Sequence, residues 1–237
     1  MKLTLHKKTK KFILIILVFL LLFAGIQTYN TVTKEETATK ETVIFEYSCH
    51  PSVDYTVYIL PNELYPGTEL EEGRYYSKRL LDYIQADFAV EYQGSDSVPV
   101  KIQYQVLATV NGYQGQAENK NIYWTKSFPL FEEKVVEIEG DSWNTTEQIN
   151  FTLDEYDALA VRAKDLTGMN VTNEVIVELL GTVTTNVTKE EVTIPFSTNL
   201  EIPLLEDVFQ VKKSAGEPIK GSVTETEEII MPFDRTK

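Results

Sequence analysis

Residues 84–110 read IQADFAVEYQGSDSVPVKIQYQVLATV, and this stretch decides the class of fold. Apolar residues alternate with mostly polar ones over 84–92 and again over 100–110. Because successive side chains of a strand point to opposite faces, each run predicts a strand with one buried face. The residues between them, 93–99, are rich in turn formers. The sequence therefore predicts that the two runs pair as an antiparallel hairpin.

The same period of two recurs along the chain, at residues 55–59, 122–126, 175–187 and 207–211. This density of strands predicts a mainly β protein, an antiparallel β-sandwich of immunoglobulin-like architecture. One segment, Asp154 to Gly168, has helical spacing instead, with acids at its start and Lys164 near its end. It predicts a single amphipathic helix that ends at the glycine and packs on the sandwich.

The amino-terminal residues predict a membrane anchor. Residues 1–11 carry five lysines and no acid, and residues 12–33 carry no charge. As a helix this uncharged stretch spans roughly 33 Å, enough for a hydrocarbon core of about 30 Å. The lysines predict a cytoplasmic amino terminus and an exported remainder. A cleaved signal peptide is the alternative, although no pattern of small residues typical of a cleavage site occurs near Ala24.

The expected organisation follows from these features. It comprises a cytoplasmic basic tail (1–11), a transmembrane helix (12–29), a polar spacer (30–42), an extracytoplasmic β-sandwich domain (43–212) and a polar carboxyl-terminal tail or edge strand (213–237). The formal net charge is −14, and residues 34–237 hold 17 of the 22 basic residues and all 36 acids. A surface this acidic excludes binding through nucleic-acid phosphates and disfavours contact with anionic lipid headgroups.

Few residues of catalytic or metal-binding type are present, with one cysteine and two histidines in 237 residues. Cys49 and His50 are adjacent at a predicted strand end, where neighbours point to opposite faces, so a thiol–imidazole pair is disfavoured. Cys49 is interpreted as structural, with an intermolecular disulfide as the alternative. We expect no catalytic residues, cofactor or metal. A carboxylate pair of the glycosidase type and calcium binding by acids such as Glu63 or Asp141 stay open.

A string of aromatic strand residues carries a resemblance to a known family. It comprises residues 55–65, YTVYILPNELY, followed by Gly73-Arg-Tyr-Tyr76, Phe88, Tyr92, Asn111-Gly-Tyr113 and Trp124. Residues 43–205 resemble a membrane-anchored, extracytoplasmic domain family of unknown function found in Gram-positive bacteria and archaea. Some relatives have a second membrane helix after the domain, so the resemblance implies either a one-anchor variant or a fragment here.

The resemblance implies an extracytoplasmic β domain with a role in envelope or surface-fibre assembly and no catalytic residues. The sequence and the resemblance together predict a single-pass membrane protein, held in the bilayer by residues 12–29, that binds an exported protein partner. The candidate interaction turn is Pro61, Asn62 and Tyr65, because proline cannot donate to a strand ladder and asparagine favours turns. The alternative function is that of a carbohydrate-binding or carbohydrate-cleaving cell-wall protein.

Overall fold

The computed structural model describes residues 7–32, 37–116, 119–187, 190–214, 216 and 218–230. The elements are α1 (Lys7–Val32), β1 (Thr37–Ile59), β2 (Glu69–Leu70), β3 (Tyr76–Ser77), the short 3-10 helix η1 (Lys78–Leu80), β4 (Leu81–Gln114), β5 (Asn121–Phe151), α2 (Asp154–Thr167), β6 (Thr172–Val187), β7 (Glu190–Pro203), β8 (Val208–Phe209), β9 (Lys212–Lys213) and β10 (Ile219–Ile230). Parts of the expected basic tail, spacer and carboxyl-terminal tail lie outside the described residues.

The chain divides into two compact units, Val43–Val223 and the remainder, Met1–Thr42 with Thr224–Lys237. The second of these contains α1, whose described side chains are those of residues 16–28. Among the described residues, no helix combines the length and the hydropathy that identify a membrane span. The unit Val43–Val223 contains the candidate surfaces.

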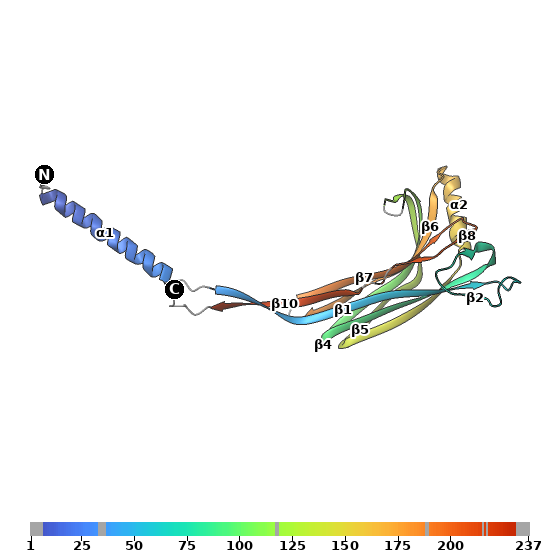
Figure 1. The fold of residues 1–237 in the computed structure, drawn as a ribbon, viewed down its shortest axis with the longest axis horizontal. Coiled ribbons are helices and arrows are strands. Elements are labelled where there is room, and N and C mark those ends of the chain that lie inside the picture. Colours follow the sequence, from blue (N-terminus) through green and yellow to red (C-terminus); the bar gives the residue numbers. More distant parts are fainter. Residues whose placement is uncertain are drawn as a thin grey trace. The chain divides into compact units, whose positions relative to one another are not determined.

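Antiparallel pairing builds the unit Val43–Val223, as the period of two predicts. One eight-stranded sheet has the order β10-β1-β4-β6-β7-β9, with β2 added to β1 and β5 added to β4, and a second sheet pairs β3 with β8 (Figure 1). Among the described strands, β5 pairs with β4 alone and is therefore an edge strand. Its proline, Pro129, sits where an edge strand tolerates a residue without an N–H group.

The expected hairpin between residues 84–92 and 100–110 is wrong, because both runs belong to the single strand β4. The first run pairs with β1 and the second with β6, while β5 accompanies both. The residues expected to form the turn are instead an irregularity in the β4–β5 ladder. From Gln93 to Val98, β4 advances by five residues, whereas β5 advances by only two, from Ser142 to Gly140. Such an insertion bends a ribbon without ending its pairing.

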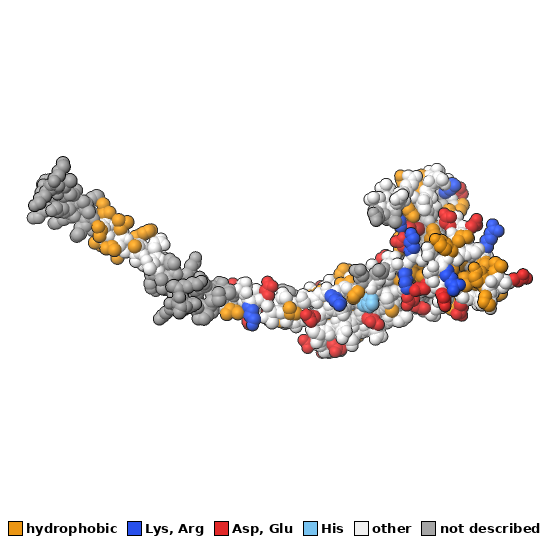
Figure 2. All heavy atoms as spheres, in the orientation of Figure 1, with side chains coloured by type: hydrophobic (Ala, Val, Ile, Leu, Met, Phe, Trp, Pro, Cys, Tyr) orange, Lys and Arg blue, Asp and Glu red, His pale blue; other side chains and the backbone are white. Residues whose placement is uncertain are grey.

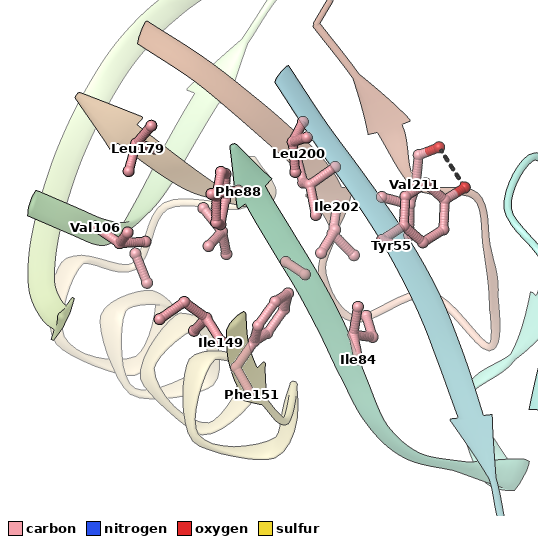
Figure 3. Packing of buried hydrophobic residues seen from close by; sticks show 14 of the residues in the cluster. Tyr55, Ile84, Phe88, Val106, Ile149, Phe151, Leu179, Leu200, Ile202 and Val211 are labelled. Carbon is pink, nitrogen blue, oxygen red and sulfur yellow. Dashed lines mark hydrogen bonds between the residues drawn. The ribbon is translucent and has the colours of Figure 1, made fainter. Parts of the chain in front are cut away.

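The β4–β5 ribbon folds over at this irregularity, so that its two halves face each other. The Tyr104 hydroxyl from one half donates a hydrogen bond of 2.6 Å to Glu147 Oε1 from the other, and Lys134 Nζ donates to the same oxygen at 3.1 Å. The core lies between the halves, where Phe88 and Val106 of β4 point toward Leu179 of β6 and Leu200 of β7 (Figure 3).

A mainly β, antiparallel fold is therefore confirmed, but the sandwich of two separate sheets is not observed. The structure instead has one sheet that curls into a half-barrel, with continuous hydrogen bonding through the curl. Alternation of apolar residues predicts which face of a strand is buried. It does not distinguish two stacked sheets from one sheet folded over its own inner face, since both bury the same residues.

The expected helix is confirmed as α2, which ends at Gly168. This glycine has a left-handed φ of 68°, and its N–H donates to the carbonyl oxygen of Lys164 at 2.8 Å. Tyr156 and Ala160 are buried against the sheet. Leu166, near the carboxyl end of the helix, is 87% exposed.

Both ends of the unit continue as strands, one into the expected spacer and the other into the segment expected to be a polar tail or an edge strand. Within the expected spacer, α1 continues to Val32 and β1 already begins at Thr37. Within the expected tail, residues 219–230 form β10, which pairs with β1. The pairing of β10 with β1 provides hydrogen-bond partners for the backbone N–H and C=O groups of these polar segments, and this stabilises them as strands.

Candidate interaction surfaces

Three chain segments far apart in sequence converge at one end of the β unit. The N–H of Leu60 donates to the carbonyl oxygen of Leu80 at 2.8 Å, and the N–H of Lys78 donates to that of Asp207 at 2.9 Å. The pairing of β3 with β8 places Ser77 opposite Val208. The loop after β1, the segment around η1 and the loop after β7 therefore form a single surface.

Two buried tyrosines hold these segments in place. The hydroxyl of Tyr55 accepts a hydrogen bond of 2.8 Å from the N–H of Gly73 and donates to the carbonyl oxygen of Val211 at 3.4 Å. The hydroxyl of Tyr76 donates to the carbonyl oxygen of Glu71 at 2.7 Å, and burial raises the pKa of this phenol. Both rings bury their apolar faces and use their polar ends to position loop backbone.

The predicted interaction turn lies within this surface. The side-chain oxygen of Asn62 accepts hydrogen bonds from the N–H groups of Leu64 at 2.9 Å and Tyr65 at 3.1 Å, and its amide nitrogen donates to the carbonyl oxygen of Leu60 at 2.8 Å. Pro61 is exposed, and Tyr65 is half-buried against the core. Asn62 thus acts as a local clamp that leaves the side chain of Leu64 in solvent.

Large apolar side chains are exposed across the converging segments. We define the tip surface as the five of them that are between 45% and 79% exposed: Leu60, Leu64, Tyr75, Leu205 and Val208. Figure 2 shows apolar side chains gathering at the end of the unit around β2. Val208 lies on the outer face of the β3–β8 pair, since its neighbour Phe209 is buried, and the exposed Tyr75 directly precedes the buried Tyr76 of β3. Clusters of this kind mark interaction sites in soluble domains.

One tip residue is held in a strained conformation. Leu205 has a φ of 63°, in the left-handed region that costs a residue with a side chain roughly 1–2 kcal/mol. Its N–H donates to Asp157 Oδ1 on α2 at 2.8 Å, and the same carboxylate pairs with Lys78. The helix therefore keeps Leu205 in this conformation, with its side chain nearly half exposed.

A second surface forms where the sheet bends. Tyr104 of β4, Gly181 of β6 and Phe196 of β7 lie in one row across the strands. Beside this row, the ladder between β4 and β5 has two adjacent bulges. In each of them β5 contains one residue more than β4, first opposite Tyr104–Val106 and then opposite Val106–Leu107. Bulges increase twist, and a glycine without a side chain allows the neighbouring strands to approach closely. The strands curve in this part of the sheet (Figure 1).

The bend creates a groove of about 880 Å³, which we name the cross-strand groove. Its lining includes Gln103, Gln105, Glu133, Leu180, Thr182 and Ser197. Gln103 and Gln105 alternate with buried Ile102, Tyr104 and Val106, so they lie on the outer face. Gln103 Nε2 donates to Glu133 Oε1 at 2.6 Å. Within the described residues, the side chains of Gln105, Thr182 and Ser197 form no hydrogen bond, so their polar groups are available to a ligand.

The cysteine and histidine weighed as a reactive pair lie on opposite faces of β1, as the strand period predicts. Cys49 is fully buried, and burial raises its pKa to about 12. His50 is exposed, with Nε2 2.8 Å from the carbonyl oxygen of Gly216. Throughout the part of the chain that is described, no three His, Cys, Asp or Glu side chains are arranged to hold a metal ion.

Comparison with known proteins gives a partial match. The model of a family of unknown function, DUF5305, matches residues 124–237, from β5 to the carboxyl terminus. No curated protein matches the chain. The match supports a domain of unknown function over this range, whereas most of the motifs that indicated the resemblance lie amino-terminal to it. Membrane anchoring and occurrence in Gram-positive bacteria and archaea stay predictions.

Sequence reasoning found the Asn62 turn but missed most of the tip surface. One signal was present in the Tyr75–Tyr76 pair, because adjacent strand residues point to opposite faces and one tyrosine must then face outward. Val208 joins the surface through pairing with a segment more than 120 residues away, and Leu205 is held there by Asp157 of α2. No local pattern predicts either contact.

Proposed function

We propose that this chain is a single-pass membrane protein whose β unit lies outside the cell and serves as an interaction module in envelope or surface-fibre assembly, with no chemistry of its own. Residues 12–29 would cross the bilayer. The five lysines of residues 1–11 favour a cytoplasmic amino terminus, and the acidic remainder suits an exported, soluble unit.

The exposure of α1 supports the anchor. All eight residues from Ile16 to Phe23 are large and apolar, and each is between 45% and 69% exposed. Eight consecutive residues cover every side of a helix, so α1 has no polar face that could be turned to water. A helix that is apolar all round is stable only when surrounded by protein or lipid.

The observation that carries the interaction function is the tip surface. Its five apolar side chains come from three converging segments fixed by hydrogen bonds to buried groups, so little conformational entropy remains to be lost on binding. We expect the partner to be an exported protein with an apolar contact surface and a basic rim. The acidic excess of residues 34–237 would attract such a rim and repel an acidic one.

Fractionation and protease accessibility test the location. The chain should remain in membranes after washing at alkaline pH, and protease added to intact cells should degrade the β unit. Replacement of Leu17, Leu20 and Leu21 by Asp should release the chain from membranes. Recovery of the intact wild-type chain from the cytosol, or complete protection of the β unit in intact cells, would contradict the proposal.

Paired variants test the partner site. The double substitution Leu64→Ser with Tyr75→Ser removes two exposed tip side chains and should abolish co-purification of the exported partner after cross-linking on cells. The matched control is Ile122→Ser with Tyr123→Ser, two exposed apolar residues at the start of β5. Equal loss of partner in both double variants, or no loss in the first, would show that the tip surface is not the site.

A further inference from the structure

The cross-strand groove has chemistry that differs from the tip surface, and we infer that it binds a segment of neutral polysaccharide. This inference develops the carbohydrate-binding alternative. It depends neither on the membrane anchor nor on the tip surface, because the groove residues lie on the sheet face at the bend, whereas the tip residues lie on the loops.

The lining of the groove matches a ligand that both donates and accepts hydrogen bonds. The amide of Gln105 and the hydroxyls of Thr182 and Ser197 each offer a donor and an acceptor. The second oxygen of the Glu133 carboxylate can accept from a ligand, because Gln103 occupies the first. Sugar hydroxyls are donors and acceptors in the same way. Leu180 and Pro195 in the lining provide apolar contact for the C–H face of a pyranose ring.

Charge and geometry disfavour the other polymers that a groove of this size could hold. A polyanion would meet Glu133 and the acidic excess of residues 34–237. A polycation would need a row of acids, and among the described residues of the lining Glu133 alone is charged. An extended peptide gains most of its affinity by adding to the edge of a sheet. Most of the groove lies instead across the outer faces of β4 and β6, which are each paired on both sides here, and of β7, which is paired with β6.

The row Tyr104–Gly181–Phe196 gives the groove a fixed shape. A Cβ atom on Gly181 would lie 2.5 Å from Cζ of Phe196 and 2.8 Å from Cβ of Tyr104, so the strands approach as closely as a glycine permits. Phe196 is 4% exposed and covers the glycine from the inner side. The polar side chains on the outer side therefore extend from a rigid bend and are positioned before the ligand arrives.

Calorimetric titration of the full-length chain with defined oligosaccharides tests the inference. The protein is kept in a polyoxyethylene detergent, since a glucoside or maltoside headgroup would itself compete for the groove. The probes are tetramers of N-acetylglucosamine, β-1,4-linked glucose and α-1,4-linked glucose, with tetragalacturonate as an anionic probe. At least one neutral tetramer should bind, and tetragalacturonate should bind at least tenfold more weakly than the best of them.

Isosteric variants locate the binding. Gln105→Leu and Thr182→Val should each weaken binding of the neutral tetramer roughly three- to tenfold, the usual effect of one lost neutral hydrogen bond. The control Gln93→Leu changes an exposed glutamine of the same strand outside the groove and should leave binding unchanged. The tip variant Leu64→Ser with Tyr75→Ser should also bind like the wild type, which separates this test from that of the protein partner.

Three results would overturn the inference: no binding of any neutral tetramer, tightest binding of tetragalacturonate, or equal affinity in the wild type and the two groove variants. Circular dichroism and urea unfolding of each variant identify loss of fold. If one groove variant fails to fold, the other and Ser197→Ala still measure the contribution of the groove.

Discussion

Substitution of Gly181 by alanine should destabilise the β unit, although alanine normally stabilises a strand relative to glycine. The added Cβ would lie less than 3.0 Å from three atoms: the carbonyl oxygen of Gln103, Cζ of Phe196 and Cβ of Tyr104. Only the Phe196 ring can rotate. The other two atoms move only with the backbone of β4, which is paired on both sides.

The expected cost is therefore that of overpacking a rigid site, about 2–3 kcal/mol, at the upper end of the usual range. With a urea m-value of about 2 kcal/mol per molar, the unfolding midpoint should fall by roughly 1 M. Equilibrium unfolding of the full-length chain in detergent, followed by the fluorescence of Trp124 and Trp143, measures this shift. Both tryptophans are partly buried against the core of the unit.

Gly67→Ala is the matched control, since a Cβ at Gly67 meets no atom within 4 Å and its φ is not left-handed. Its midpoint should equal that of the wild type or lie slightly above it. An unfolding midpoint of Gly181→Ala within roughly 0.2 M of the wild type, with an unchanged m-value, would refute this prediction. The strands would then not approach as closely at the bend as the structure indicates, and the rigidity assigned to the groove would be lost with them.

Three further predictions concern the helix end, the ribbon fold and the thiol. Gly168→Ala should lower the free energy of unfolding by about 1 kcal/mol relative to the same Gly67→Ala control. The cost is conformational alone, because Gly168 has a φ of 68° and no neighbouring atom lies within 4 Å of the added Cβ. Equal unfolding midpoints of the two variants would refute this prediction. Burial alone would raise the pKa of the Glu147 carboxyl, but the hydrogen bonds from Tyr104 and Lys134 lower it below its usual value of 4.5. The stability that this carboxylate provides is therefore complete above about pH 4.5 and lost as the pH falls through the lowered pKa, and Glu147→Gln should be less sensitive to acid over that window in urea titrations; an identical acid dependence would refute the assignment. Cys49, with its pKa raised to about 12, should resist alkylation at pH 8 until urea unfolds the chain, and a disulfide-linked dimer on a non-reducing gel of native protein would contradict its burial.

The candidate surfaces show where local patterns stop being informative. Asn62 could be recognised as a turn residue because its side chain bonds to backbone two and three residues ahead, within the same stretch of sequence. Leu205 could not be recognised, because its left-handed conformation depends on Asp157 of α2. The groove was equally hidden: Gln105, Thr182 and Ser197 are ordinary outward strand residues until pairing places them in neighbouring rows.

The sequence by itself determined the buried faces of the strands and the helix ending at Gly168, because side-chain periodicity and the conformational freedom of glycine act within a few residues. It left open which strand pairs with which, so residues 84–92 and 100–110 were expected to pair with each other although they form one strand. Only the tertiary structure decided that the β4–β5 ribbon folds over at Gln93–Val98 and that three loops meet at the tip. Backbone hydrogen bonding is nearly independent of side-chain identity, so the choice among partners depends on how the whole inner face is buried.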